Sequence, residues 1–160
     1  MDLAVYLYFY RPQETKKIMS TTNHITTKWK GNMAFESNNP SGLDLRIDVD
    51  AENGGDNSGF RPKALLLSGL AGCSGLDVAS LMKKMKLDVD EFTIETIANL
   101  TDEHPKYYDH VRIEYHFHGG NLNEEKLQKA VDLSVEKYCG VMEMFRRFAT
   151  LDIKTIFHHK

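Results

Sequence analysis

The chain has 160 residues, which is enough for a single domain with a hydrophobic core and no disulfide stapling. Hydrophobic residues make up 41% of it and charged residues 27%, and 20 basic against 23 acidic side chains give a net charge of −3. This balance excludes the strongly basic surface of a protein that binds nucleic acid or an anionic membrane. Two cysteines and no recognisable secretory signal favour a cytoplasmic protein with a redox or catalytic thiol.

The first residues differ in character from the rest of the chain. Leu3–Tyr10 is apolar, but Asp2 stands where a signal peptide carries positive charge, and the segment is too short to span a bilayer. Met19 begins an ordinary polar stretch. We therefore expect residues 1–18 to be an N-terminal extension and residues 19–160 to form one domain. Alternating tyrosines within the extension leave open an added edge strand.

Short strands are predicted next. His24–Lys30 and Met33–Asn38 are β-type runs separated by Gly31-Asn32, a pattern that predicts a hairpin. Leu43–Asp50 alternates strictly between apolar and charged residues, as a half-buried antiparallel strand does. Ala51–Gly59 is rich in glycine, asparagine and aspartate, and this composition predicts a mobile loop.

A long helix is predicted from Pro62 to Lys86, because proline suits the first helical position. Its first half, Ala64–Gly72, has no charge on any face, which is typical of a helix buried at the centre of a fold or in a subunit interface. Glycine recurs at every third position, although glycine destabilises a helix. Its missing side chain lets another backbone or a substrate approach closely. The three glycines are Gly69, Gly72 and Gly75.

The second half of the chain mixes strands and helices. Its predicted elements are strands Phe92–Leu100 and Val111–His118, helices Asn123–Lys137 and Val141–Phe148, and a final strand Leu151–Phe157. With the first half, the order is three strands, a helix, two strands, two helices and a strand. This order predicts an α+β fold and not a doubly wound sheet.

The two cysteines are the candidate chemical groups. Cys73 lies in the apolar helix between small neighbours, where a core would favour bulk, and Cys139 lies at a helix junction. Amides that open the following helix would stabilise a thiolate at Cys139 or position a partner sulfur. The alternative is that each is a small buried core residue, which is common for free cysteines. Taken alone, the pair is a weak indication of function.

Three stretches together resemble one known family. Gly59–Cys73, Glu136–Val141 and Trp29–Gly31 resemble the osmotically inducible protein C and organic hydroperoxide resistance family (OsmC/Ohr), with most likeness to its YhfA-like branch. The resemblance implies an OsmC-like fold with antiparallel sheets around a buried central helix. It also implies an intertwined homodimer with two active sites at the subunit interface.

The resemblance further implies a thiol peroxidase that needs no cofactor. Cys73 would attack an organic hydroperoxide and become a sulfenic acid, and Cys139 would then close a disulfide that a dithiol reductant reopens. Helical spacing suggests an apolar pocket that favours hydrophobic peroxides. Its candidate lining residues are Leu66, Leu70 and Met142.

The sequence departs from the family pattern at two supporting positions. The family's thiolate is held by an arginine after the tryptophan of the first hairpin, but Trp29–Pro40 contains no arginine and Phe35 falls near that position. The family's glutamate after the helix proline is replaced by Lys63. Either efficient peroxide turnover is lost, or another cation lowers the pKa of the attacking thiol from its usual value of about 8.5. The candidate cations are Lys63, Arg61 and Arg46.

Three other functions remain open at this point. Cys73 would be a hydrolase nucleophile if a histidine served as its base. The protein would instead be a non-catalytic dimeric binding protein if the glycine-striped helix formed a pocket for a small apolar ligand. His116 and His118 share a predicted strand face and His158-His159 nearly end the chain, but no metal-binding spacing accompanies them. We therefore expect a solvated strand face, a frayed end and no metal.

Overall fold

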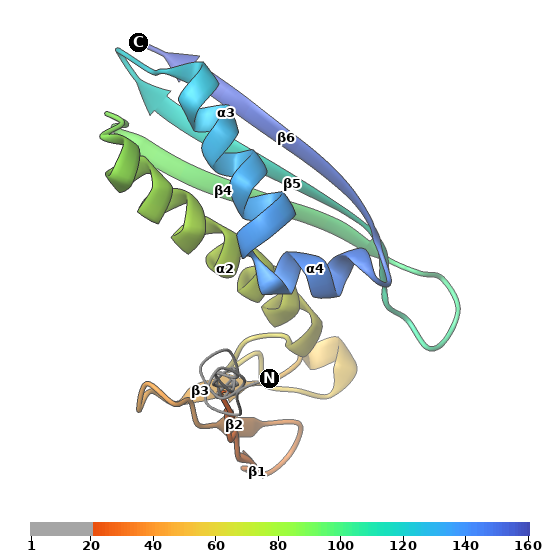
Figure 1. Cartoon of the computed structure of the whole chain (residues 1–160). Coiled ribbons are helices and arrows are strands. Elements are labelled where there is room, and N and C mark those ends of the chain that lie inside the picture. The colour runs from red at the N-terminus through yellow and green to blue at the C-terminus, as the bar shows by residue number, and fades with distance from the viewer. Residues whose placement is uncertain (1–20) are drawn as a thin grey trace, which may run out of the picture.

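The structure, a computed structural model, describes residues 21–160, so the extension predicted for residues 1–18 lies outside the described part. Figure 1 shows two sheets and a layer of helices. The elements are β1 (Thr27–Trp29), β2 (Phe35–Ser37), β3 (Leu45–Ile47), η1 (Ala51–Asn53), α2 (Pro62–Met85), β4 (Glu91–Leu100), β5 (Tyr108–Gly119), α3 (Glu124–Leu133), η2 (Ser134–Tyr138), α4 (Gly140–Arg146) and β6 (Thr150–His159). The predicted α+β class and order of elements are confirmed.

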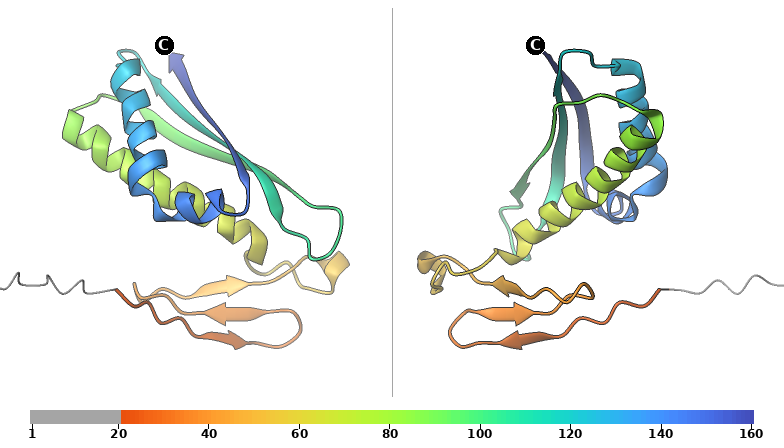
Figure 2. Two further views of the ribbon diagram at one scale, coloured as in Figure 1. Left: turned by 45° about the vertical axis from the view of Figure 1, so that its right-hand side comes forward. Right: turned by 90° about the vertical axis from the view of Figure 1, so that its left-hand side faces the viewer.

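The small sheet has the order β1-β2-β3, and both of its strand pairs are antiparallel. The turn between β1 and β2 places Gly31 and Asn32 at φ angles of 98° and 46°, and the Lys30 amide donates to the Ala34 carbonyl at 2.9 Å. Glycine and asparagine tolerate this left-handed backbone, so the predicted hairpin is confirmed, with shorter strands. Figure 2 shows this sheet as a separate layer at the start of α2.

The loop after β3 is folded around a buried carboxylate. Asp48 is 1% exposed and accepts hydrogen bonds from the Ser58 hydroxyl at 2.6 Å and from the Ser58 and Asp56 amides at 3.0 and 3.2 Å. These bonds, chiefly that of the Ser58 hydroxyl, lower the pKa of Asp48 to about 2. The alternation of Leu43–Asp50 predicted that its charged residues face solvent. For Asp48 this prediction is wrong, because the loop predicted to be mobile turns back over its carboxylate.

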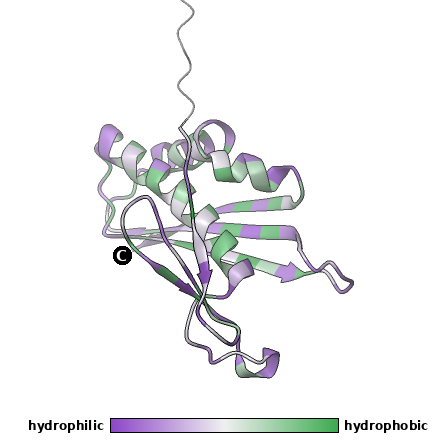
Figure 3. Ribbon diagram, turned by 90° about the horizontal axis from the view of Figure 1, so that it is seen from below, coloured by the Kyte–Doolittle hydropathy of each residue, from purple (hydrophilic) through white to green (hydrophobic). Residues whose placement is uncertain are grey.

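The large sheet has the order β4-β5-β6. Strands β4 and β5 are antiparallel, but β5 and β6 are parallel because α3 and α4 form a crossover between them. The expectation of purely antiparallel sheets is therefore wrong for β6. Figure 3 shows hydrophobic and hydrophilic residues alternating along these strands. The inward residues of β5 form the centre of the core: Val111, Ile113, Tyr115 and Phe117.

Helix α2 packs against β4, α3 and α4 along one stripe only. The buried residues of this stripe are Leu70, Ser74, Val78 and Leu81. By length and composition α2 is apolar enough to cross a membrane, yet only 17% of its most apolar stretch is buried. The expected burial on all sides is therefore absent among residues 21–160 of a single chain. Gly75 does permit a close approach, because a Cβ there would lie 3.0 Å from Ile94 Cδ1.

Candidate functional site

The two cysteines come together where α2 passes the junction between η2 and α4. Cys73 is half-buried in the middle of α2, and Cys139 is 4% exposed at the position that precedes the first turn of α4. Both are free thiols, and the Cys73 side chain is close enough to Cys139 to raise the pKa of that thiol. Two residues separated by two strands and a helix are thus adjacent in space.

The surroundings of Cys139 favour its neutral thiol. The Met142 amide donates to Cys139 Sγ at 3.3 Å, and the Val141 amide also lowers the pKa of this thiol. Burial acts more strongly in the opposite direction, and the neighbouring Cys73 thiol adds to it, so the pKa of Cys139 is raised to about 11. The helix amides therefore position this sulfur without making it a thiolate at neutral pH.

A buried hydroxyl network lies beside the thiols. Ser74 Oγ is 2.5 Å from the Tyr115 hydroxyl and 2.9 Å from Ser134 Oγ, and all three residues are fully buried. Burial raises the pKa of Tyr115 to about 12, so its hydroxyl stays protonated. Sequence analysis did not identify this network. Its one signal was a serine at position 134 on the otherwise apolar inner stripe of the helix.

Ser134 connects the network to the second cysteine. It begins the π-helical segment η2, and its carbonyl accepts a hydrogen bond from the Cys139 amide at 2.9 Å. Its hydroxyl also donates to the carbonyl of Ser74, the residue after Cys73, at 3.2 Å. A π-helical turn displaces the chain relative to an α-helix and is common at functional sites. Ser134 therefore fixes the positions of both cysteines relative to each other.

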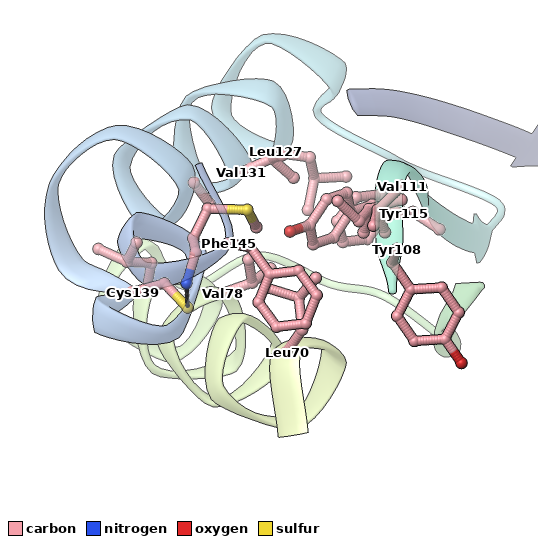
Figure 4. Packing of buried hydrophobic residues seen from close by; sticks show 14 residues of the cluster. Leu70, Val78, Tyr108, Val111, Tyr115, Leu127, Val131, Cys139 and Phe145 are labelled. Carbon is pink, nitrogen blue, oxygen red and sulfur yellow. Dashed lines mark hydrogen bonds between the residues drawn. The ribbon is translucent and has the colours of Figure 1, made fainter. Parts of the chain in front are cut away.

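The three pocket candidates lie in different environments. Leu70 and Met142 are fully buried and belong to the same hydrophobic cluster as Cys139, drawn in Figure 4. Leu66 is 53% exposed, on a part of α2 that the other described residues leave uncovered. The structure thus brings two of them to the core around the thiols, and their role as a substrate pocket stays a prediction.

Two of the three candidate cations have other partners in the chain, and the third is distant from Cys73. Arg61 pairs with Asp50 at 2.9 Å, and Arg46 Nε donates to the Ser58 hydroxyl at 2.9 Å. Lys63 is exposed in the first turn of α2, about 15 Å along the helix axis from Cys73. The main influences on the pKa of Cys139 are burial, the Met142 and Val141 amides and Cys73, and none of the three cations is among them. Their role in supporting a thiolate stays a prediction.

Comparison with known proteins identifies the family. The sequence profile described as "OsmC-like protein" matches residues 55–154, a range that includes both cysteines. The chain belongs to the OsmC-like protein family. It is 30% identical to Protein YhfA of Escherichia coli strain K12 over 120 residues, which cover 75% of this chain and 87% of that protein. The resemblance seen in the sequence is therefore confirmed.

Solved structures share the OsmC-like fold. A hypothetical protein from Aquifex aeolicus VF5 is 28% identical and superposes with a TM-score of 0.77, covering 88% of this chain and 99% of that one. A protein from Legionella pneumophila named as the organic hydroperoxide resistance protein OsmC is 18% identical, with a TM-score of 0.62 over 85% of this chain and 97% of that one. At that identity the second likeness concerns the fold alone.

Proposed function

We propose that this protein is a thiol-dependent redox protein that reduces organic hydroperoxides, with Cys73 as the attacking thiol and Cys139 as the resolving thiol. The observation that carries the proposal is the proximity of these two side chains, which is close enough for Cys73 to raise the pKa of Cys139. A disulfide needs both sulfurs within bonding reach, and residues on separate elements meet in this way only through the tertiary fold. Membership of a family with relatives named for organic hydroperoxide resistance supports the substrate class.

Exposure and protonation support this assignment of roles. Cys73 is the more exposed of the two thiols, so a peroxide reaches it first. Cys139 is buried, and its pKa of about 11 keeps it protonated at neutral pH, where a thiol is a poor nucleophile. Cys139 is therefore suited to the second step, in which an activated sulfur is already adjacent to it.

The proposed cycle has three balanced steps. The Cys73 thiolate attacks one peroxide oxygen, the O–O bond breaks, and an alcohol leaves after taking up a proton while Cys73 becomes a sulfenic acid. The Cys139 sulfur then displaces the sulfenic hydroxyl, which leaves as water with the Cys139 proton, and a disulfide forms. A dithiol reductant restores both thiols and is itself oxidised to a disulfide. The cytoplasm, where such reductants are abundant, suits this cycle.

We also propose that the active form is a homodimer. Helix α2 has no charged residue from Ala64 to Gly72, yet Leu66 in this part and Leu76 just beyond it are 53% and 74% exposed. Exposed apolar surface of this kind on a central helix is typical of a subunit interface. A partner that covers α2 would also approach Cys73, so it would exclude water from the thiol pair and bring further charged side chains toward it.

Mass spectrometry after one equivalent of cumene hydroperoxide tests the redox cycle. The parent protein is expected to form a Cys73–Cys139 disulfide, and the Cys139→Ser variant is expected to accumulate a sulfenic acid at Cys73. A Cys73→Ser variant is the matched control and is expected to leave Cys139 reduced, because that thiol is protonated and buried.

Two results would contradict the proposed roles. If both thiols of the parent protein stay reduced over many minutes, the peroxidase function is wrong, and tight retention of a lipid-like molecule would then favour an apolar-ligand binding protein. If Cys139 is oxidised in the Cys73→Ser variant as fast as in the parent, the order of attack is reversed.

A further inference from the structure

The outer face of the large sheet carries a cluster of acidic and imidazole side chains. Along β5, Tyr115 points inward to Ser74, so its neighbours Glu114 and His116 point outward, where each side chain is only 15% exposed. Glu95 on β4 lies opposite Glu114 in the strand register. Potential ligand atoms of Glu95, Glu114 and His116 all lie within 4.8 Å of one another.

The ring of His116 is held in a defined orientation by the last strand. Its Nδ1 is 3.0 Å from Nε2 of His158, which in turn stacks on His118 with ring centroids 4.1 Å apart. The prediction of a frayed C-terminal end is wrong for His158, because this residue lies within β6 and pairs with His118 in the parallel register. The tautomer of His116 in which Nδ1–H donates to His158 has its lone pair on Nε2.

That Nε2 atom is buried and has no hydrogen-bond partner within residues 21–160. Glu114 Oε2 lies 3.7 Å from it. In that tautomer neither the ionised carboxylate nor the imidazole lone pair has a proton to donate to the other, so a cation between them would bind to both. Lys154 and Arg112 approach the other carboxylate oxygen, Oε1, at 3.6 and 3.9 Å, which leaves Oε2 facing His116.

We propose that Glu95, Glu114 and His116 bind a divalent transition-metal ion, with Zn²⁺ as the ion whose chemistry fits best. One imidazole nitrogen and two carboxylate oxygens are an accepted ligand set for zinc, with bond lengths of about 2.0–2.2 Å. Atoms that already lie within 4.8 Å reach these distances by rotation of side chains. His158 would act on the metal only through His116, since a bond to the second ring nitrogen is the usual outer support of a zinc-bound histidine.

The site lies on the opposite face of β5 from Ser74 and the thiols, so it does not depend on the proposed redox function. The test uses untagged full-length protein stripped of metal by a chelator and titrated calorimetrically with Zn²⁺. One ion is expected to bind per chain. His116→Gln and Glu114→Gln are each expected to weaken binding at least about tenfold, and His158→Gln by about tenfold or more. The matched control is His159→Gln, which removes the exposed histidine that pairs with Glu124 at 2.6 Å and is expected to leave binding unchanged.

Titration with Co²⁺ separates this site from the thiols. Binding through nitrogen and oxygen gives ligand-field bands without sulfur-to-metal charge transfer, and a Cys73→Ser variant is expected to give the same spectrum. Circular dichroism establishes that each variant is folded. The proposal is overturned if the folded parent protein does not bind Zn²⁺ saturably, if folded His116→Gln binds as tightly as the parent, or if binding is lost with Cys73.

Discussion

Replacing Leu76 by alanine tests whether α2 lies in a subunit interface. Leu76 is 74% exposed in the single chain, so a partner that covers it can bury about three quarters of the side chain. Full burial of a leucine contributes about 1.5–3 kcal/mol, which gives about 1–2 kcal/mol for this fraction. A two-fold symmetric interface contains the residue twice, so the dimer loses about 2–4 kcal/mol. The dissociation constant is therefore expected to rise about 30- to 1000-fold.

Sedimentation equilibrium over a dilution series measures this change. Lys84→Ala is the matched control, because Lys84 is exposed in the last turn of the same helix and carries a solvated charge. It is expected to leave the dissociation constant within about threefold of the parent. Circular dichroism checks that both variants fold. The interface at α2 is refuted if Leu76→Ala associates as tightly as the parent, or if the parent sediments as a monomer at every concentration.

In the native protein at pH 7, Cys139 is expected to react slowly with iodoacetamide, because a pKa of about 11 leaves about one thiol in ten thousand ionised. The reaction rate is expected to rise about tenfold per pH unit. Mass spectrometry follows the modification, and a native rate equal to that of denatured protein would contradict this environment. Ser134→Ala is expected to lower the free energy of unfolding in urea by about 1–3 kcal/mol, because Ser74 loses a buried hydrogen-bond partner. Exposed Ser80→Ala is its control, and equal effects of the two substitutions would argue against the network. Because hydrogen bonds lower the pKa of Asp48 from 3.8 to about 2, its contribution to stability is complete above about pH 4 and is lost as the pH falls through 2. In the Asp48→Asn variant, the urea midpoint of unfolding is therefore expected to fall less over that pH range than in the parent protein. An unchanged pH profile would count against this role.

The secondary structure followed largely from local patterns in the sequence. Period-two alternation predicted β4 and β5, and Asn123 marks the start of α3, where its side chain accepts a hydrogen bond from the Lys126 amide at 3.1 Å. The parallel pairing of β6 with β5 was not predicted, because alternation along a strand is the same for either direction of its neighbour. The alternation predicted a solvated position for Asp48. It did not show that the loop after β3 folds back and supplies hydrogen-bond donors to this carboxylate.

The sequence by itself determined the α+β class, the family, and the two cysteines as the candidate chemical groups, because these depend on residue types and their local spacing. Only the tertiary structure decided that Cys73 lies close to Cys139 and that burial keeps Cys139 protonated. It also joined Ser74, Ser134 and Tyr115 into one network. Each of these contacts depends on how α2 packs against the crossover helices and β5, and such long-range packing leaves no periodic signal along the chain.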